Sequence, residues 1–233
     1  MSLLWKHDMY AVKGHSHVIG LDEAGRGPLA GPVVVAAVTL SSDFFKLASH
    51  RKNTREFNDS KLLAEERRLE LFRWMEKARE QDRLNYASET AEVEEIEQYN
   101  VYQATTRAMR RAIEKLPSEL QPQPTTDDLP LFQTSGKESV LRPLVLLDGK
   151  PMKKLGHPHR AIVKGDSKSL AIAMASILAK TLRDKMLIEL SNEFPQYGFA
   201  SHKGYGTPQH IEALLKHGAC PQHRPRFLRN LEL

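Results

Sequence analysis

Residues 18–35 read VIGLDEAGRGPLAGPVVV, two apolar runs joined by a turn rich in glycine and proline. The first run stops at two adjacent acids, Asp22 and Glu23, and the second begins at residue 33. These runs predict buried strands over 17–22 and 33–40, and the short connection between them predicts antiparallel neighbours. A strand that ends in charged side chains predicts a functional site, because sites in α/β sheets form at strand ends.

The rest of the chain alternates helical and strand patterns. Ser169 is a predicted N-cap, and Thr207 followed by Pro208 predicts the start of the last helix. Helices are predicted over 61–80, about 91–115 and 170–190, and further strands over 83–88, 144–148 and 161–166. This order of elements indicates an α/β fold in which helices cover a mixed sheet.

Composition limits the classes of protein. The 233 residues are enough to bury a sizeable core, and a net charge of +5 favours a polyanionic partner. The single cysteine, Cys220, excludes an internal disulfide and is typical of a reducing compartment. No run of 18 apolar residues occurs and the first residues lack the pattern of a secretory signal, so we expect a cytoplasmic protein without a membrane partner.

Four carboxylates are candidates for one site. Asp22, Glu23 and Asp148 follow predicted strands, and helical spacing places Asp184 on one face with Lys180 and small residues that allow close approach to a sheet. Clustered carboxylates repel one another unless a cation lies among them. A site made of oxygen donors selects Mg²⁺ or Mn²⁺, and two such ions can activate water against a phosphodiester.

Spacing alone leaves a second interpretation open. An acid at a strand end is commonly a turn residue, and Asp184 between two basic residues is typical of a solvated charge. Strict alternation also sends Asp22 and Glu23 to opposite faces of the sheet, so the two side chains are expected to converge only if the turn begins at Glu23.

The turn itself holds Gly25, Gly27 and Gly31 around Arg26. Glycine-rich backbone can form an anion-binding nest, and the arginine adds a donor fork for phosphate. The alternative is a tight hairpin that needs glycine for its geometry. The spacing misses the dinucleotide-binding fingerprint and no helical pattern follows, which excludes a Rossmann interpretation.

The stretch DEAGRGPLAGPVVVAAV resembles the signature of the ribonuclease HII family, the type 2 ribonucleases H. Four later blocks resemble that family in the same order and together cover almost the whole chain: NDSKLL (58–63), LLDG (146–149), KGDSKSLAIAMASILAKTLRD (164–184) and HKGYGTPQH (202–210). The resemblance implies a ribonuclease H-like fold, with a central mixed five-stranded sheet flanked by helices and a small helical C-terminal part.

The resemblance also implies the activity. Such an enzyme hydrolyses the RNA strand of RNA–DNA hybrids, nicks DNA 5′ of embedded ribonucleotides, leaves 3′-hydroxyl and 5′-phosphate ends, and so removes misincorporated ribonucleotides. The family's four catalytic, metal-binding acids match Asp22, Glu23, Asp148 and Asp184, with Mg²⁺ or Mn²⁺ as cofactor. We expect a monomer with an N-terminal extension (1–15), a catalytic domain (16–195) and a C-terminal segment that contacts substrate (196–233).

Substrate contacts follow from the same resemblance. The family's GRG element, which contacts the 2′-hydroxyl and the neighbouring phosphate, matches Gly25, Arg26 and Gly27. Tyr205 matches a tyrosine that stacks on the deoxyribose after the ribonucleotide. The blocks that line the family's substrate groove supply three further predicted phosphate contacts, Lys61, Lys164 and Lys180.

Two segments depart from the family pattern. The tail HRPRF (223–227) differs from the family's HRRSF-like motif, and the proline-rich loop 117–140 is longer than the usual link. Within that loop, DDLPLF (127–132) resembles the peptide by which bacterial DNA enzymes bind the sliding clamp. The alternative, which we favour, is that its apolar residues hold the loop against the core.

Other residues are expected to be structural. The irregular spacing of His202, His210 and His223 predicts surface or capping roles without zinc. Trp5 and Trp74 are expected to pack in the core. Asp59 and Asp166 are expected to support the site without direct roles.

Three competing functions remain at this stage. A non-catalytic hybrid-binding protein on the same fold would not need four intact acids. Ribonuclease HIII has a related core but a different glycine-rich turn and an additional N-terminal domain. A DEDD-type exonuclease has four acids but lacks this turn and the GYG block.

Overall fold

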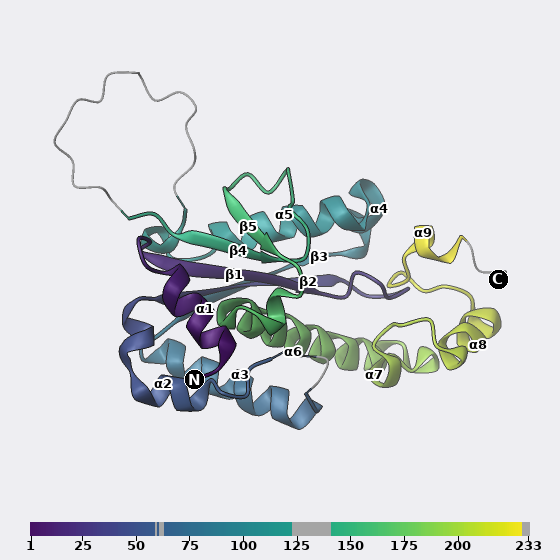
Figure 1. Cartoon of the computed structure of the whole chain (residues 1–233). Coiled ribbons are helices and arrows are strands. Elements are labelled where there is room, and N and C mark those ends of the chain that lie inside the picture. Colours follow the sequence, from purple (N-terminus) through teal and green to yellow (C-terminus); the bar gives the residue numbers. More distant parts are fainter. Residues whose placement is uncertain (59, 61–62, 123–140, 230–233) are drawn as a thin grey trace, which may run out of the picture.

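The computed structural model describes residues 1–58, 60, 63–122 and 141–229. Within these residues, five strands form one mixed sheet in the order β3-β2-β1-β4-β5. Helices cover both faces of the sheet, and the C-terminal helices extend beyond one end of it (Figure 1). The predicted α/β fold with a mixed five-stranded sheet is therefore confirmed.

The sheet joins an antiparallel half to a parallel half at its central strand, β1. Strands β1, β2 and β3 pair antiparallel, whereas β1, β4 and β5 pair parallel. The strand bounds are β1 His17–Ala24, β2 Val33–Ser41, β3 Asn85–Ala91, β4 Leu144–Asp148 and β5 His159–Ile162. Because β1 and β4 run side by side in the same direction, their carboxyl ends meet at one edge of the sheet.

One face of the sheet is covered by the longest helix in the described chain, α6 (Leu170–Glu193). Ser169 accepts a hydrogen bond from the backbone N–H of Ile172 and caps the helix as predicted. The first turn of α6 lies directly on β1 at Gly20, where a Cβ atom would lie 2.2 Å from the carbonyl carbon of Ala171. Glycine at this position therefore permits the close approach that brings α6 to the end of β1.

The opposite face is covered by α4 (Val93–Tyr99) and α5 (Val101–Glu114). The prediction of one long helix over 91–115 is wrong. Asn100 breaks it with a φ of 68°, and its side chain caps α5 by accepting hydrogen bonds from Tyr102 and Gln103 N–H groups at 3.1 Å.

The predicted N-terminal extension contains helix α1 (Leu3–Ala11), which packs on α6 through the buried Trp5. Asp8 is fully buried and accepts hydrogen bonds from Ser169 Oγ (3.0 Å) and Ala171 N (2.8 Å). A carboxylate at a helix N-terminus is stabilised by the helix dipole, so this contact fixes α1 to the start of α6. Trp74 also packs against this core, as predicted.

The remaining helices flank the same core or form the C-terminal part. Their bounds are α2 Ala48–Asn53, α3 Glu65–Glu80, α7 Phe199–His202, α8 Pro208–His217 and α9 Pro225–Leu228. Thr207 caps α8, with Pro208 at its first position, as predicted. The C-terminal helices have their own small apolar cluster, which contacts the turn after β1 through Ala30.

Three strand predictions need correction at their ends. Strand β1 continues through Glu23 to Ala24, because both residues pair with β2. Strand β3 lies at 85–91 and not at 83–88, and β5 lies at 159–162 and not at 161–166. The strand cannot continue past β5 because Lys164 adopts a left-handed conformation (φ 55°) that leads into a 3-10 turn.

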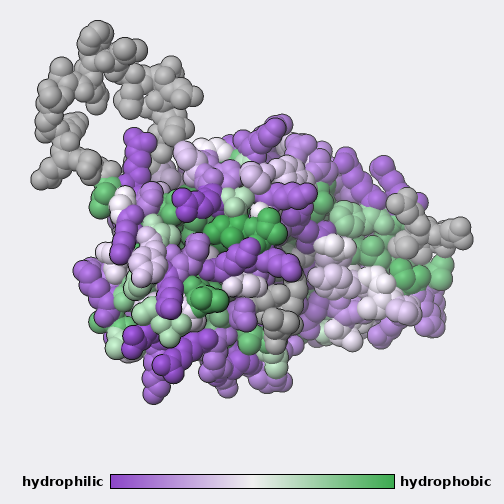
Figure 2. Space-filling view, viewed as in Figure 1, coloured by the Kyte–Doolittle hydropathy of each residue, from purple (hydrophilic) through white to green (hydrophobic). Residues whose placement is uncertain are grey.

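Figure 2 shows hydrophilic side chains over most of one face, with smaller apolar patches between them. Of the helices in the described ranges, none combines the length and hydropathy needed to span a membrane.

Candidate active site

A cavity of about 550 Å³ opens where β1 and β4 end beside α6. Its lining includes three of the four predicted catalytic acids, Asp22, Glu23 and Asp148. The described residues that line it are Asp22, Glu23, Ala24, Gly25, Arg26, Gly27, Ser60, Arg68, Asp148, Asp166, Ser176, Lys180, Arg183 and Tyr205. The cavity therefore joins the carboxylates to the glycine-rich turn and to the predicted sugar-stacking tyrosine.

Asp22 is the most deeply placed of these acids. It follows Val18 and Gly20 on the α6 side of β1, and only 5 % of its surface is exposed. Its Oδ1 accepts a hydrogen bond from the Glu23 N–H at 2.7 Å. Burial, together with the nearby charges of Glu23 and Asp148, raises the pKa of Asp22 well above its ordinary value, and the Ser176 hydroxyl opposes this shift in part.

Glu23 reaches the cavity although β1 does not end there. The condition that the turn begins at Glu23 is not met, yet both carboxylates border the cavity because it lies at the end of the strand. Glu23 Oε1 accepts a hydrogen bond from Arg26 Nη1 at 3.0 Å. This ion pair links the acids to the glycine-rich turn after β1.

Asp148 ends β4 on the side of the sheet that faces α6. Its Oδ1 accepts a hydrogen bond from the Gly165 N–H at 2.6 Å, which fixes one carboxylate oxygen. Asp166 follows in the same 3-10 turn and also lines the cavity. The sequence prediction that Asp166 supports the site is consistent with this position.

Asp184 does not line this cavity. It borders a neighbouring pocket of about 360 Å³ between α3 and α6, and the two cations that contact it, Lys180 and Arg68, line the carboxylate cavity. Lys180 Nζ lies 2.5 Å from its Oδ1, and Arg68 Nη2 lies 3.2 Å from its Oδ2. Burial lowers the pKa of Lys180, and the Asp184 carboxylate opposes that shift.

The donor set fits a hard divalent cation. Three carboxylates border one cavity, and no thiol is among its described lining residues. Burial and the charges of Glu23 and Asp148 raise the pKa of Asp22, and a cation bound among these carboxylates would oppose that shift. Within the described ranges, no three His, Cys, Asp or Glu side chains form a preassembled metal centre. Asp184 does not join the other carboxylates in such a centre, because its two oxygens contact Lys180 and Arg68.

The turn after β1, residues 25–31, is named here the recognition loop. Gly25 has a φ of 98°, and a Cβ atom there would lie 2.0 Å from Nε of Arg183, so only glycine fits. A Cβ atom on Gly27 would lie 3.9 Å from the Tyr205 ring, and that ring is 48 % exposed. The tyrosine thus presents an open face beside the loop.

Two buried arginines that the sequence analysis did not single out hold the recognition loop. Arg183 donates to the carbonyl oxygens of Pro32, Lys203 and Ala30, and Arg224 donates to several carbonyls between residues 25 and 31. Arg224 lies in the HRPRF tail, whose departure from the family pattern was noted without a role. The sequence analysis did not predict five of the described lining residues as part of the site: Ala24, Ser60, Arg68, Ser176 and Arg183.

The prediction of surface or capping roles for the histidines is wrong for two of them. His210 and His223 are buried, and their Nε2 atoms lie 3.0 Å apart. His210 Nδ1 also lies 2.9 Å from the Tyr205 carbonyl, and His223 lies next to Ala30 through an isolated bridge. The pair therefore connects the tyrosine segment to the recognition loop.

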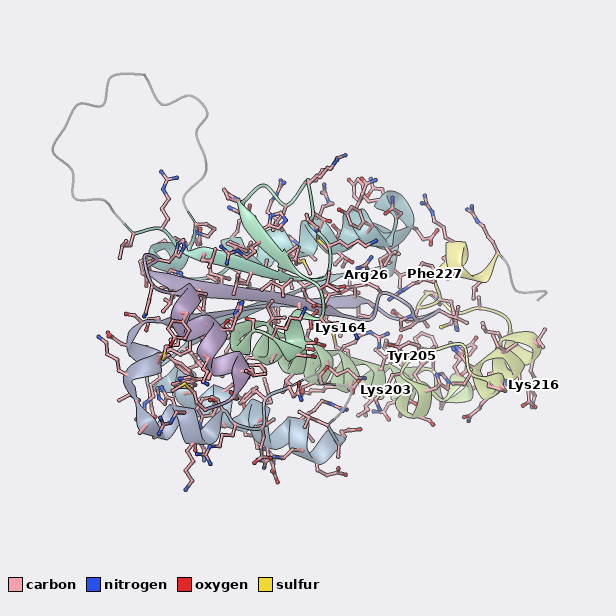
Figure 3. All side chains as sticks on the ribbon, in the orientation of Figure 1. Arg26, Lys164, Lys203, Tyr205, Lys216 and Phe227 are labelled. Carbon is pink, nitrogen blue, oxygen red and sulfur yellow. The ribbon has the colours of Figure 1, made fainter. Side chains whose placement is uncertain are left out.

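Lys164, a further predicted contact, is not among the described residues that line the cavity. Lys164 is exposed on the turn after β5, and Figure 3 shows it with Arg26 and Tyr205 around the region where β1 meets the C-terminal segment. Lys61 and the segment 127–132 lie outside the described residues.

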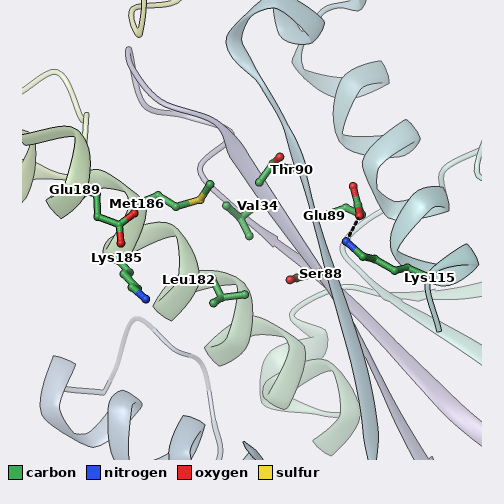
Figure 4. A pocket seen from close by; sticks show the side chains of 9 residues that line it. All are labelled: Val34, Ser88, Glu89, Thr90, Lys115, Leu182, Lys185, Met186 and Glu189. Carbon is green, nitrogen blue, oxygen red and sulfur yellow. Dashed lines mark hydrogen bonds and ion pairs between the residues drawn. The ribbon is translucent and has the colours of Figure 1, made fainter. Parts of the chain in front are cut away.

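A third pocket, of about 370 Å³, lies between β2, β3 and the second half of α6 (Figure 4). It contains the ion pair between Lys115 and Glu89 at 2.7 Å and includes none of the predicted site residues among its described lining. Its composition gives no reason to place the chemistry there.

The mixed sheet and the carboxylate-lined cavity define a protein of the ribonuclease H-like class, and solved structures share this fold. Ribonuclease H2 from Pyrococcus horikoshii superimposes with a TM-score of 0.62 at 21 % identity, over 92 % of this chain and 100 % of that chain. Ribonuclease HII from Archaeoglobus fulgidus, solved in complex with PCNA, gives 0.63 at 21 % identity, over 93 % and 96 %. Bst ribonuclease HIII, solved with Mn²⁺, gives 0.57 at 14 % identity, over 91 % and 65 %.

The family model of ribonuclease HII matches residues 19–230. The ribonuclease HII of Ruminiclostridium cellulolyticum is 42 % identical over 219 residues, covering 94 % of this chain and 72 % of that protein. That of Albidiferax ferrireducens is 46 % identical over 210 residues, covering 90 % and 85 %. This chain belongs to the ribonuclease HII family, and it is an endoribonuclease, a hydrolase that acts on RNA–DNA hybrids.

Proposed function

We propose that this endoribonuclease nicks duplex DNA on the 5′ side of an embedded ribonucleotide, leaves 3′-hydroxyl and 5′-phosphate ends, and so removes misincorporated ribonucleotides from DNA. The observation that carries the proposal is that one cavity is bordered both by carboxylates and by a glycine-rich loop with an exposed tyrosine. The first group can hold a scissile phosphate through a metal, and the second can test the sugar next to it.

Asp22, Glu23 and Asp148 would hold Mg²⁺ or Mn²⁺, with Asp184 reaching the site if it exchanges its contacts with Lys180 and Arg68. When bound, such ions lower the pKa of a water and stabilise charge on the phosphate oxygens. The carboxylates themselves bind and orient, and the Asp148 side chain is held for this purpose by the Gly165 amide.

Sugar recognition is assigned to the recognition loop and Tyr205. The 2′-hydroxyl is the only chemical mark of one ribonucleotide within a DNA duplex, and a site built to bond it rejects a sugar that lacks it. The Arg26 and Gly27 amides belong to the loop, and the Tyr205 ring stands opposite Gly27. A ring against the following sugar favours a deoxyribose without the additional hydroxyl.

Basic side chains supply attraction for the phosphate backbone. Arg26 lines the cavity, and Lys164, Lys203 and Lys216 come from three other segments. Figure 3 shows Lys203 and Lys216 on the C-terminal segment and Lys164 nearer to the middle of the molecule. Binding through such contacts weakens as salt increases, because phosphate neutralisation releases counterions.

The test is cleavage of an end-labelled DNA duplex with one ribonucleotide, in Mg²⁺, in Mn²⁺ and in EDTA. We expect one metal-dependent nick, 5′ of the ribonucleotide. The two ends at the nick should be a 3′-hydroxyl and a 5′-phosphate. Cleavage restricted to runs of several ribonucleotides would refute sugar recognition at a single site and indicate specificity like that of ribonuclease HIII.

An Asp22→Asn variant that cleaved as well as the wild type would refute the carboxylate assignment. A folded wild-type protein that cleaved neither substrate would leave only hybrid binding.

A further inference from the structure

We propose that Arg224 and Arg183 are positioning residues for recognition of the 2′-hydroxyl, and that Arg224 in the C-terminal tail sets the specificity of the recognition loop for ribose. This inference rests on the proposed function. It assigns a role in substrate discrimination to two side chains that lie behind the loop and do not need to contact the nucleic acid.

Arg224 is completely buried, and within the described residues its side chain donates only to backbone carbonyls of the recognition loop. Its Nη2 lies 2.7 Å from the Gly25 oxygen and 2.6 Å from the Gly31 oxygen, and its Nε lies 2.9 Å from the same Gly31 oxygen. Its Nη1 lies 3.0 Å from the Pro28 oxygen and 3.2 Å from the Arg26 oxygen. One guanidinium thus satisfies four carbonyls that span the whole loop.

These contacts set the direction of the loop amides. In a trans peptide the N–H points opposite to the C=O of the same unit. Because the Gly25 and Arg26 carbonyls point to Arg224, the N–H groups of Arg26 and Gly27 point away from it, toward the open side of the loop. In the described part of the chain neither amide donates a hydrogen bond, so both are available to a sugar hydroxyl or a phosphate.

Arg183 holds the loop from α6. Its Nη2 lies 3.2 Å from the Ala30 oxygen in the loop, and its Nε lies 3.0 Å from the oxygen of Pro32, the residue that follows the loop. The Nε atom also occupies the space that a side chain at residue 25 would need. Its Nη1 lies 3.0 Å from the Lys203 oxygen, so it also fixes the segment that carries Tyr205. Both halves of the proposed sugar site, loop and tyrosine, therefore depend on one side chain.

Both arginines keep their charge at neutral pH. Burial lowers the pKa of Arg183 to about 10 and that of Arg224 to about 9, which leaves both protonated near pH 7. Among the described residues neither forms an ion pair with a carboxylate at salt-bridge distance. Two positive charges behind the loop therefore add to the attraction of its amides for anionic groups.

Lysine cannot replace Arg224 in this role. The planar guanidinium has five donors in a fixed fork, whereas an ammonium has three donors on a compact centre. Arg224→Lys would keep the charge and lose part of the carbonyl contacts, which releases the direction of the amides. This is the conservative change that separates positioning from charge.

The experiment compares two duplexes that differ at one sugar, ribose or 2′-deoxy-2′-fluororibose, where the fluorine keeps the sugar shape but cannot donate a hydrogen bond. The measured quantity is kcat/KM for the ribose duplex divided by kcat/KM for the fluororibose duplex, both in Mg²⁺. Because both substrates meet the same enzyme preparation, the ratio does not depend on the folded fraction. The matched control is Arg110→Lys, since Arg110 also holds a loop through two carbonyls, of Lys154 (2.7 Å) and Leu155 (3.0 Å), away from the recognition loop.

We expect Arg224→Lys to lower the ratio at least about tenfold through slower cleavage at ribose, while Arg110→Lys leaves the ratio unchanged. Arg183→Lys should lower it as well and also raise KM, because the tyrosine segment is released. An unchanged ratio in Arg224→Lys, with a wild-type enzyme that discriminates, would overturn the inference. A wild-type enzyme that does not discriminate between the sugars would instead overturn the proposed function.

Discussion

Arg183 and Asp184 are neighbours on α6, and their side chains serve different parts of the site. Arg183 holds the recognition loop through the Ala30 carbonyl, while Asp184 engages Lys180 and Arg68 beside the carboxylate cavity. Successive residues on a helix point about 100° apart, so one turn of α6 reaches both parts. The position of α6 along β1, which Gly20 permits, therefore sets the distance between the recognition loop and the carboxylate cavity.

Asp22→Asn should inactivate the enzyme and stabilise it without metal. Loss of a proposed metal ligand should lower kcat/KM at least about a hundredfold. The pKa of Asp22 is raised in the fold, so its ionised form opposes folding at neutral pH, and the amide removes this penalty. Urea unfolding in EDTA should show a gain in stability at pH 7 that disappears as the pH falls toward the ordinary aspartate pKa.

The control for this variant is Asp43→Asn, because Asp43 is exposed and pairs only with Lys46 at the surface. It should change neither activity nor the pH dependence of unfolding. A destabilised Asp22→Asn protein at pH 7 would contradict the electrostatic account of the cavity.

Arg68→Lys should reduce activity about 10–100-fold with little effect on substrate binding. Arg68 links Asp184 (3.2 Å) to the backbone at Ser60 (3.3 Å) and Leu63 (2.5 Å), and a lysine cannot make all three contacts. The adjacent Arg67, which pairs at the surface with Glu56 and Glu70, is the matched control. Steady-state kinetics on a single-ribonucleotide duplex check this, and equal losses in Arg67→Lys would show that Asp184 orientation is not the cause.

Gly25→Ala should destabilise the protein by more than backbone strain alone. A non-glycine residue at φ 98° costs about 1–3 kcal/mol, and here the new Cβ would also overlap Arg183. Gly14→Ala isolates the strain, because Gly14 has a φ of 83° with nothing within 4 Å of the added carbon. Urea unfolding should rank the two variants in that order, and equal losses would mean that Arg183 moves freely out of the way.

Acid should loosen the C-terminal part through His223. Burial lowers its pKa to about 4, while the unfolded chain takes up a proton near 6.5. Between these values the unfolded state binds more protons than the fold, so stability falls as the pH falls from about 6.5 to about 4. His223→Gln should flatten this part of the stability curve.

The comparison for that curve is His217→Gln, since His217 is exposed on α8. Its unfolding should keep the acid-dependent loss of the wild type. A wild-type stability that stays constant between pH 6.5 and 4 would contradict the prediction for the buried histidine pair.

Much of the fold could be predicted from local sequence patterns. Helix α6 could be predicted because Ser169 supplies a cap and a long apolar run follows it, and β1 and β2 because both are continuous buried runs. The break at Asn100 could not be predicted in the same way, because this single residue with a positive φ separates the two helices without changing the apolar spacing around it.

Such patterns predict the site less completely than the fold. Asp22, Glu23 and Asp148 mark strand ends, so a sequence pattern brings them together. Whether Asp184 faces the same cavity depends on Arg68, which comes from a separate helix and has no local signal among many charged neighbours. The role of Arg224 could not be predicted for the same reason. Its partners are distant in sequence, and they are backbone carbonyls, which no residue type reveals.

The bond from Arg224 to the Gly31 carbonyl also orders events during synthesis of the chain. The two residues are 193 positions apart, so the loop leaves the ribosome long before the side chain that fixes it. Helix α6 and the carboxylate edge can form first, and the loop acquires its final backbone only when the tail arrives. Chains that stop before Arg224 are therefore expected to hold the acids without a fixed recognition loop.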